Sequence, residues 1–269
     1  MVNSIRAELY KLTHRAYFYG FNLCCAAFAL LVVGCLCYIK FAAAPSAELV
    51  NFPFALTPLY LGMPIGLCLV MLGGDAVFSE QYKYNTLKNE VSYGLSRTRI
   101  YLSRLVVSLL LMAVVFVVTM GVYLLASLVL LGIPSDAVAL DSFGMNAAQS
   151  VQMVMGMLGF YVLASLPLWL GALAIAMACL FLIRGSNLAG MGFLVLMVGV
   201  PALLDKLGYY VHPIFRQLYH LTLNYSMDLV TSSSTVGWSL IGQCWIIGLA
   251  WAVIATTAGL FFFSRREIN

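Results

Sequence analysis

The sequence predicts an all-α membrane protein with six transmembrane helices, and its composition is the first reason. Hydrophobic residues make up 63% of the chain and charged residues only 9%, whereas a soluble domain carries about a quarter charged residues. The second reason is that apolar runs of roughly 18 residues or more recur along the chain, each long enough as a helix to cross a ~30 Å hydrocarbon core. The strands of a membrane barrel would alternate apolar and polar residues instead, so helical spans are favoured.

The apolar runs give six spans, which together form a single transmembrane domain over residues 1–269. The spans are Gly20–Ile39, Pro58–Phe78, Leu105–Leu131, Val151–Ile183, Leu188–Leu204 and Trp238–Phe263. The first is expected to stay uncleaved, because its apolar core of about twenty residues exceeds the 7–15 residues of a signal peptide. The fourth would be roughly 50 Å long as a helix. It must therefore tilt, project beyond the membrane or bend at Pro167.

The basic residues orient the chain in the membrane. With the N-terminus inside, the inner segments hold 11 of the 14 Lys and Arg residues: Arg6, Lys11, Arg15, Lys83, Lys88, Arg97, Arg99, Arg104, Arg184, Arg265 and Arg266. The outer segments hold the other three: Lys40, Lys206 and Arg216. Because inner segments of membrane proteins carry the excess of Lys and Arg, we expect both termini in the cytoplasm.

The residues before the first span are expected to form an amphipathic helix. Ile5, Leu9, Leu12 and Ala16 follow helical spacing, and the basic residues of this segment lie off that apolar stripe. Such a helix lies on the inner leaflet, either as an elbow that braces the first span or as a plain anchor.

The longest outer segment, Asp205–Val236, is rich in tyrosine and has one apolar helical face, made of Ile214, Leu218, Leu221 and Tyr225. We expect it to lie at the outer interface or to dip into the membrane. Its histidines, His212 and His220, are eight residues apart with no carboxylate or cysteine in register, so no metal site is expected. All seven cysteines fall within the spans and form no C-x-x-C pair, so we interpret them as packing residues.

The chain lacks the sequence signatures of catalysis. It contains no H-E-x-x-H, G-x-S-x-G or G-x-x-x-x-G-K-[ST] motif. Asp75 is the only acid close to a span interior; we expect it to cap its helix after Gly73-Gly74 or to pair with a basic loop residue. We therefore expect a chain that is not an enzyme by itself and binds no cofactor, so that any energy for uphill transport comes from another chain.

The cytoplasmic segment from Glu80 to Arg104 is polar and basic within this apolar chain. Asn85 and Thr86 suit a helix N-cap, and Gly94 suits a helix end. Leu87, Val91 and Leu95 form one stripe, with Lys88, Asn89 and Glu90 off it. A second helix begins at Arg97 after a fresh N-cap at Ser96. The segment is thus predicted to form a surface helix, a sharp turn and a helix that rises into the membrane. The surface helix could bind in the groove of a partner protein. Alternatively, the segment is a solvated loop whose basic residues lie against lipid headgroups.

The same segment carries a resemblance to a known family. Its pattern E-x-x-x-x-x-T-L-K-N-x-x-S-Y-G-L-S-R-x-x-I-Y-L-S-R-L, from Glu80 to Leu105, resembles the loop between spans two and three of ABC type-2 export permeases. Most similar is the bacterial group of lantibiotic-immunity, bacitracin-resistance and multidrug permeases, and the six-span layout is also similar. Two departures are Asn85, where Gly is frequent in the family, and Arg104, where Lys is commoner.

The resemblance implies a permease subunit in the plasma membrane of a bacterium. Its loop would dock on a separate cytoplasmic ATPase, present in two copies, which binds ATP and magnesium. A second permease chain, identical or paralogous, would complete the complex in the membrane lipid, without nucleic acid. The cargo would be amphipathic (a peptide antibiotic such as a lantibiotic or bacteriocin, a drug or a lipid-like molecule), exported in self-protection or resistance.

The resemblance also assigns candidate site residues. The ATPase-coupling residues would be Glu80, Thr86, Leu87, Lys88, Asn89, Glu90, Val91, Gly94, Ser96 and Arg97. The candidate outer contacts for cargo, taken from the tyrosine-rich segment, are Tyr209, Tyr210, His212 and Tyr219. Two alternatives stay open: an ATP-independent secondary transporter, for which we find no charge at mid-span, and a membrane immunity or sensor protein without transport.

Overall fold

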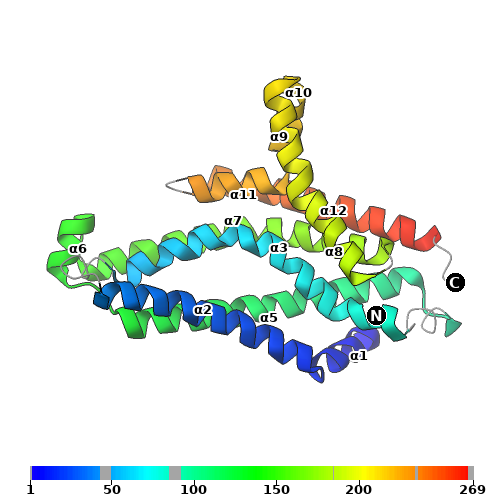
Figure 1. Cartoon of the computed structure of the whole chain (residues 1–269), viewed down its shortest axis with the longest axis horizontal. Coiled ribbons are helices and arrows are strands. Elements are labelled where there is room, and N and C mark those ends of the chain that lie inside the picture. Colours follow the sequence, from blue (N-terminus) through cyan, green and yellow to red (C-terminus); the bar gives the residue numbers. More distant parts are fainter. Residues whose placement is uncertain (1, 43–49, 85–91, 184, 234–235, 266–269) are drawn as a thin grey trace. The chain divides into compact units, whose positions relative to one another are not determined.

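A computed structural model describes residues 2–42, 50–84, 92–183, 185–233 and 236–265, and within these ranges the regular structure is helical (Figure 1). The helices are α1 (Val2–Thr13), α2 (Ala16–Ala42), α3 (Phe52–Tyr84), α5 (Arg97–Leu131), α6 (Asp136–Phe143), α7 (Ala147–Leu182), α8 (Ser186–Leu194), the π-helical segment η2 (Val195–Gly199), α9 (Val200–Tyr210), α10 (Pro213–His220), α11 (Leu223–Ser232) and α12 (Trp238–Arg265). Among these residues, six helical stretches are long and apolar enough to cross a membrane: Ala16–Ala42, Phe52–Phe78, Arg97–Leu131, Ala147–Leu182, Ser186–Tyr210 and Trp238–Arg265. The chain therefore has the architecture of a helical multi-pass membrane protein, as the sequence predicted.

The helices are longer than the apolar runs that predicted them. The fifth span, expected at Leu188–Leu204, continues to Tyr210 through α8, η2 and α9. α7 is one helix of 36 residues with Pro167 inside it. The expectation that Asp75 caps a helix end is wrong, because α3 runs on to Tyr84 and Asp75 lies within it. The Asp75 carboxylate instead accepts a hydrogen bond from the Ser186 hydroxyl at the start of α8.

The chain divides into two compact units, and α3, α5 and α7 contribute residues to both. Unit 2 comprises Ala16–Gly62 and Ala113–Val162. A small buried cluster in this unit joins α2, α3 and α5 through Leu36, Ala55 and Leu131. The Lys40 ammonium donates to the Leu131 carbonyl, which ends α5 and has no partner within its own helix.

Unit 1 comprises Met1–Arg15, Met63–Met112 and Leu163–Asn269, and the second half of α7 is its core. Every residue from Gly171 to Phe181 is buried. This stretch alternates alanine with larger apolar residues, and small residues allow neighbouring helices to approach closely within a membrane. A helix that is apolar on all sides belongs in such an interior position.

Candidate functional site

The segment predicted to couple this chain to an ATPase ends where α5 begins. Gly94 has a φ of +84°, in the left-handed region that favours glycine, and a side chain there would meet nothing within 4 Å. α5 starts at Arg97, and the Ser96 carbonyl accepts a hydrogen bond from the Ile100 N–H at 3.1 Å. The predicted turn and the predicted helix start are therefore both present.

The rest of the predicted coupling set is placed less completely. Thr86, Leu87, Lys88, Asn89, Glu90 and Val91 lie outside the described residues. Glu80 belongs to α3, and its side chain is not among those described. Gly94 and Ser96 are exposed.

Arg97 contacts the end of the last span. Its guanidinium donates to the carbonyls of Phe263, at 3.0 Å, and Ser264, at 2.6 Å. The last carbonyls of a helix have no partner within it and carry the negative end of the helix dipole, so a cation there is favoured. Arg97 therefore joins the start of α5 to the end of α12.

A second arginine of α5 is enclosed by aromatic rings. Arg104 is 1% exposed, and its guanidinium lies 5.5 Å from the centre of the Phe78 ring and 5.9 Å from that of Phe181. Cations are attracted to the faces of aromatic rings, and more strongly when water is excluded. Arg104 therefore faces the interior of unit 1.

These rings belong to an inner aromatic cluster, which we define as Phe78, Tyr101, Phe181 and Phe263. The ring of Phe181 lies 4.6 Å from those of Phe78 and Tyr101 and 4.8 Å from that of Phe263. Each ring comes from a different helix (α3, α5, α7 and α12), and each is at most 1% exposed. A side chain at Gly259 would lie 2.5 Å from the Tyr101 hydroxyl oxygen, so α12 approaches α5 closely here.

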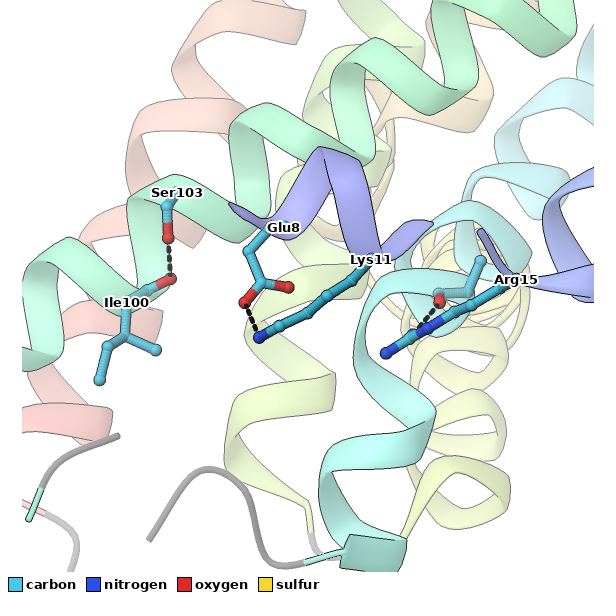
Figure 2. A network of polar contacts seen from close by, with 6 residues as sticks. Glu8, Lys11, Arg15, Ile100 and Ser103 are labelled. Carbon is cyan, nitrogen blue, oxygen red and sulfur yellow. Dashed lines mark hydrogen bonds and ion pairs between the residues drawn. The ribbon is translucent and has the colours of Figure 1, made fainter. Parts of the chain in front are cut away.

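The helix before the first span contacts the same part of unit 1. Figure 2 shows the Arg15 side chain, which follows α1, donating to a carbonyl of α3, and the Lys11–Glu8 ion pair on α1. The carbonyl belongs to Ala76, and the bond is 3.3 Å long. Ser103, also drawn in Figure 2, donates to the Ile100 carbonyl within α5 at 3.0 Å.

The tyrosine-rich segment after the fifth span folds back to the middle of α12. The turn between α10 and α11 includes Leu221, whose carbonyl accepts a hydrogen bond from the indole N–H of Trp251 at 2.8 Å. Trp251 is at the centre of α12, so the turn lies at mid-span depth. Of the two placements that the sequence left open, the structure favours the one in which this segment dips into the membrane.

Hydrogen bonds from within the protein hold the turn. The Thr222 hydroxyl caps α11 by accepting from the Tyr225 N–H, and it donates to the Tyr219 carbonyl. Non-helical backbone is tolerated at membrane depth where protein groups satisfy it. α11 itself packs inward through buried Leu223, Met227 and Val230.

The predicted outer contacts are therefore not equivalent. Tyr209 and Tyr210 end α9 and are 79% and 76% exposed. His212 caps α10, because its Nδ1 accepts from the Ile214 N–H at 3.2 Å. Tyr219 donates to the Asp228 carboxylate at 3.3 Å.

Two backbone carbonyls lack their usual helical hydrogen bond because a proline stands four residues later, and each accepts a hydrogen bond from a side chain of another helix. The sequence did not predict these bonds. Pro167 has no N–H to donate to the Leu163 carbonyl four residues earlier, and Trp245 of α12 donates to that carbonyl at 3.1 Å. Pro201 leaves the Met197 carbonyl free in the same way, and the Asn224 amide donates to it at 2.6 Å. A proline in a predicted span indicates which carbonyl lacks its helical hydrogen bond, but it does not indicate which residue will donate to that carbonyl instead.

Replacing Trp245 by phenylalanine should destabilise the protein by roughly 1–3 kcal/mol, because the Leu163 carbonyl then lies at membrane depth without its donor. In the Pro167→Ala background, residue 167 regains its N–H, and the same Trp245→Phe change should cost much less. Thermal unfolding of the four proteins in detergent forms a double-mutant cycle that measures the difference. Equal costs in both backgrounds would contradict this pairing.

Within the described ranges, no three His, Cys, Asp or Glu side chains come together as a metal site. His212 and His220 lie at opposite ends of α10. No protein-family model matches the chain, and no curated protein is significantly similar to it.

Proposed function

We propose that this chain is the permease subunit of an ATP-driven ABC exporter that moves an amphipathic cargo out of the membrane or cell. Six long apolar helices support a transporter of this kind, as does the resemblance of Glu80–Leu105 to the family loop. The chain carries no nucleotide-binding motif of its own, so ATP and magnesium are assigned to a separate ATPase. The complex would hold two ATPases and two permease chains in a bacterial plasma membrane.

The topology proposed with this function has both termini in the cytoplasm. The bias of 11 inner against three outer basic residues supports it. α1 then lies on the inner leaflet as an elbow helix, and its Arg15 contact with Ala76 would brace it against α3. The segment 86–91 would be the coupling helix in the cytoplasm.

One observation carries the mechanism: the start of α5 is fixed to three other helices. Arg97 contacts the end of α12, and Arg104 lies between rings of α3 and α7. A push on the loop at Gly94–Arg97 would therefore move the inner parts of four helices together. Closure of the ATPases on ATP would supply that push and open a path for the cargo.

The outer end of the path would begin at the tyrosine-rich segment. Tyr209 and Tyr210 are exposed for a first contact, and His212 and Tyr219 fix α10 behind them. Few charges lie within the spans, which favours amphipathic or lipid-like cargo over small hydrophilic ions.

The test is to purify the chain with and without the ATPase encoded beside it in the genome. We expect no ATP hydrolysis by the chain alone, and loss of the ATPase from the complex when Lys88→Glu reverses a charge in the loop. Lys206→Glu makes the same change on the proposed outer side and should leave the complex intact. Replacing Tyr209, Tyr210 and Tyr219 should weaken protection of cells against a lantibiotic without lowering ATP hydrolysis.

Hydrolysis by the single chain would contradict the proposal, as would a Lys88→Glu complex that stays assembled. Protection unchanged by the three tyrosine replacements would contradict the outer contact alone. Each part of the proposal can therefore fail separately.

A secondary transporter is the second candidate, because the dipping segment brings ionisable groups near mid-span. His220 stacks on Tyr225 with ring centres 4.2 Å apart, and Asp228 accepts from Tyr219. Ionisable groups at that depth are typical of ion and proton pathways. Uptake or release by the lone chain in vesicles under a proton gradient, lost in His220→Gln, would favour this candidate over the exporter.

A further inference from the structure

An open pocket lies on the α9–α10 hairpin, at the end of the fifth span. Its volume is about 390 Å³. The lining residues are Asp205, Lys206, Tyr209 and Tyr210 of α9 and Arg216 of α10. Two cations and two tyrosines therefore face one space, together with a single carboxylate.

The hairpin is built so that the two cations share this pocket. A side chain at Gly208 would lie 2.7 Å from the backbone nitrogen of Arg216 and 2.9 Å from its Cα, so only glycine allows α10 to lie this close to α9. His212 caps α10 and Pro213 begins it, which suits a helix that starts directly after the turn. Arg216 is thereby carried to the side of α9 that bears Lys206.

The positive charge of the pocket is not neutralised by an ion pair within the described chain. The one ion pair found among the described residues is between Lys11 and Glu8, on α1. Lys206 and Arg216 together outnumber Asp205 by two charges to one. Each pocket residue with a formal charge is exposed and makes no hydrogen bond with the rest of the described chain, so an anionic group can reach the cations without breaking an existing contact.

The hairpin that carries the pocket presents side chains suited to contact with lipid. The pocket has two tyrosines, and tyrosine is enriched in membrane proteins where lipid headgroups meet the hydrocarbon. In Figure 1 the hairpin of α9 and α10 projects away from α11 and α12. Leu203, Ile214 and Leu218 on it are 58%, 52% and 47% exposed, as lipid-facing side chains are.

We propose that this pocket binds the phosphate of a membrane phospholipid headgroup, with Lys206 and Arg216 as its ligands. Arginine and lysine are the side chains that bind phosphate most strongly, through charge-assisted hydrogen bonds. The acyl chains would lie along the exposed apolar side chains of α9 and α10. A bound phospholipid would anchor the hairpin whether or not the chain is an exporter, so this inference does not depend on the proposed function.

Binding of short-chain phospholipids to the purified full chain in detergent tests the proposal by calorimetry. The probes are dihexanoylphosphatidylglycerol, dihexanoylphosphatidylethanolamine, dihexanoylglycerol without phosphate, and inorganic phosphate. We expect both phospholipids to bind. Arg216→Gln or Lys206→Gln should each lower the affinity for them by roughly tenfold, as expected for the loss of one charge-assisted hydrogen bond. Arg216→Lys should keep much of the binding. Arg6→Gln, the matched control, removes an exposed charge on α1 and should change nothing.

Several results would overturn the proposal. Equal binding of dihexanoylglycerol would show that the phosphate is not recognised, and equal binding of inorganic phosphate would show that the site is not for a lipid. Equal weakening by Arg6→Gln would show that net charge alone sets the affinity. A variant that misfolds is identified by its thermal unfolding, and Gly208→Ala then tests the site from the backbone, since it should lower phospholipid affinity by pushing Arg216 away from α9.

Discussion

The Gly248→Ala variant should lose roughly 1–3 kcal/mol of folding stability or more, the cost of adding a methyl group to a closely packed interior. A Cβ at Gly248 would lie 2.3 Å from the Pro167 carbonyl oxygen and 2.4 Å from its carbon. A Cβ at Gly171 would lie 2.9 Å from the Gly248 carbonyl oxygen. The backbones of α7 and α12 are thus in direct contact here, and backbone atoms cannot move to relieve a clash as a flexible side chain can.

The matched control is Gly242→Ala, six residues earlier in α12. A side chain at Gly242 would meet nothing within 4 Å, so this change should be neutral or should stabilise by up to about 1 kcal/mol through helix propensity. Thermal unfolding in detergent, followed by tryptophan fluorescence, measures both variants against the parent. Similar unfolding midpoints for the two variants would contradict close contact between α7 and α12.

The features that sequence alone predicted are those that short-range physics determines. Apolar runs of sufficient length can satisfy their backbone groups in lipid only as helices, which is why the six spans were found. Gly94 and Arg97 were placed correctly because a left-handed turn needs glycine and a helix start needs a cap. Their positions follow from residues within one or two turns.

The features that sequence alone missed depend on contacts between distant residues. The hydrogen bonds from the Arg97 guanidinium to carbonyls at the end of α12 were not predicted, because the two residues are more than 160 positions apart. Asp75 was expected at a helix end, yet the polar residues after Phe78 continue α3. Hydrophobic periodicity shows which face of a helix is apolar, but it does not show which other helix packs against that face. For this reason the sequence did not predict that the segment after the fifth span brings His220 and Asp228 toward mid-span.

Arg97→Met should uncouple ATP hydrolysis from protection, if the exporter proposal is correct. Methionine is a long, unbranched side chain of similar reach, but it removes the charge 6.0 Å from the centre of the Phe263 ring and both hydrogen bonds to the end of α12. Motion of the loop would then reach α5 without being passed to α12. We expect resistance of cells to a lantibiotic to fall by roughly tenfold or more, as for the loss of charged hydrogen bonds worth about 1.5–3 kcal/mol. The purified complex should still hydrolyse ATP.

Arg97→Lys helps to distinguish two roles of Arg97: passing motion from α5 to α12, and binding the ATPase. Lysine keeps a cation at the helix end and can donate to one of the two carbonyls, so it should restore part of the resistance. If Arg97 instead binds the ATPase, as the family resemblance implies, Arg97→Met should release the ATPase and abolish hydrolysis as well as protection. Because the two roles predict opposite results for the same purified complex, retention of the ATPase decides whether Arg97 transmits the motion or receives it.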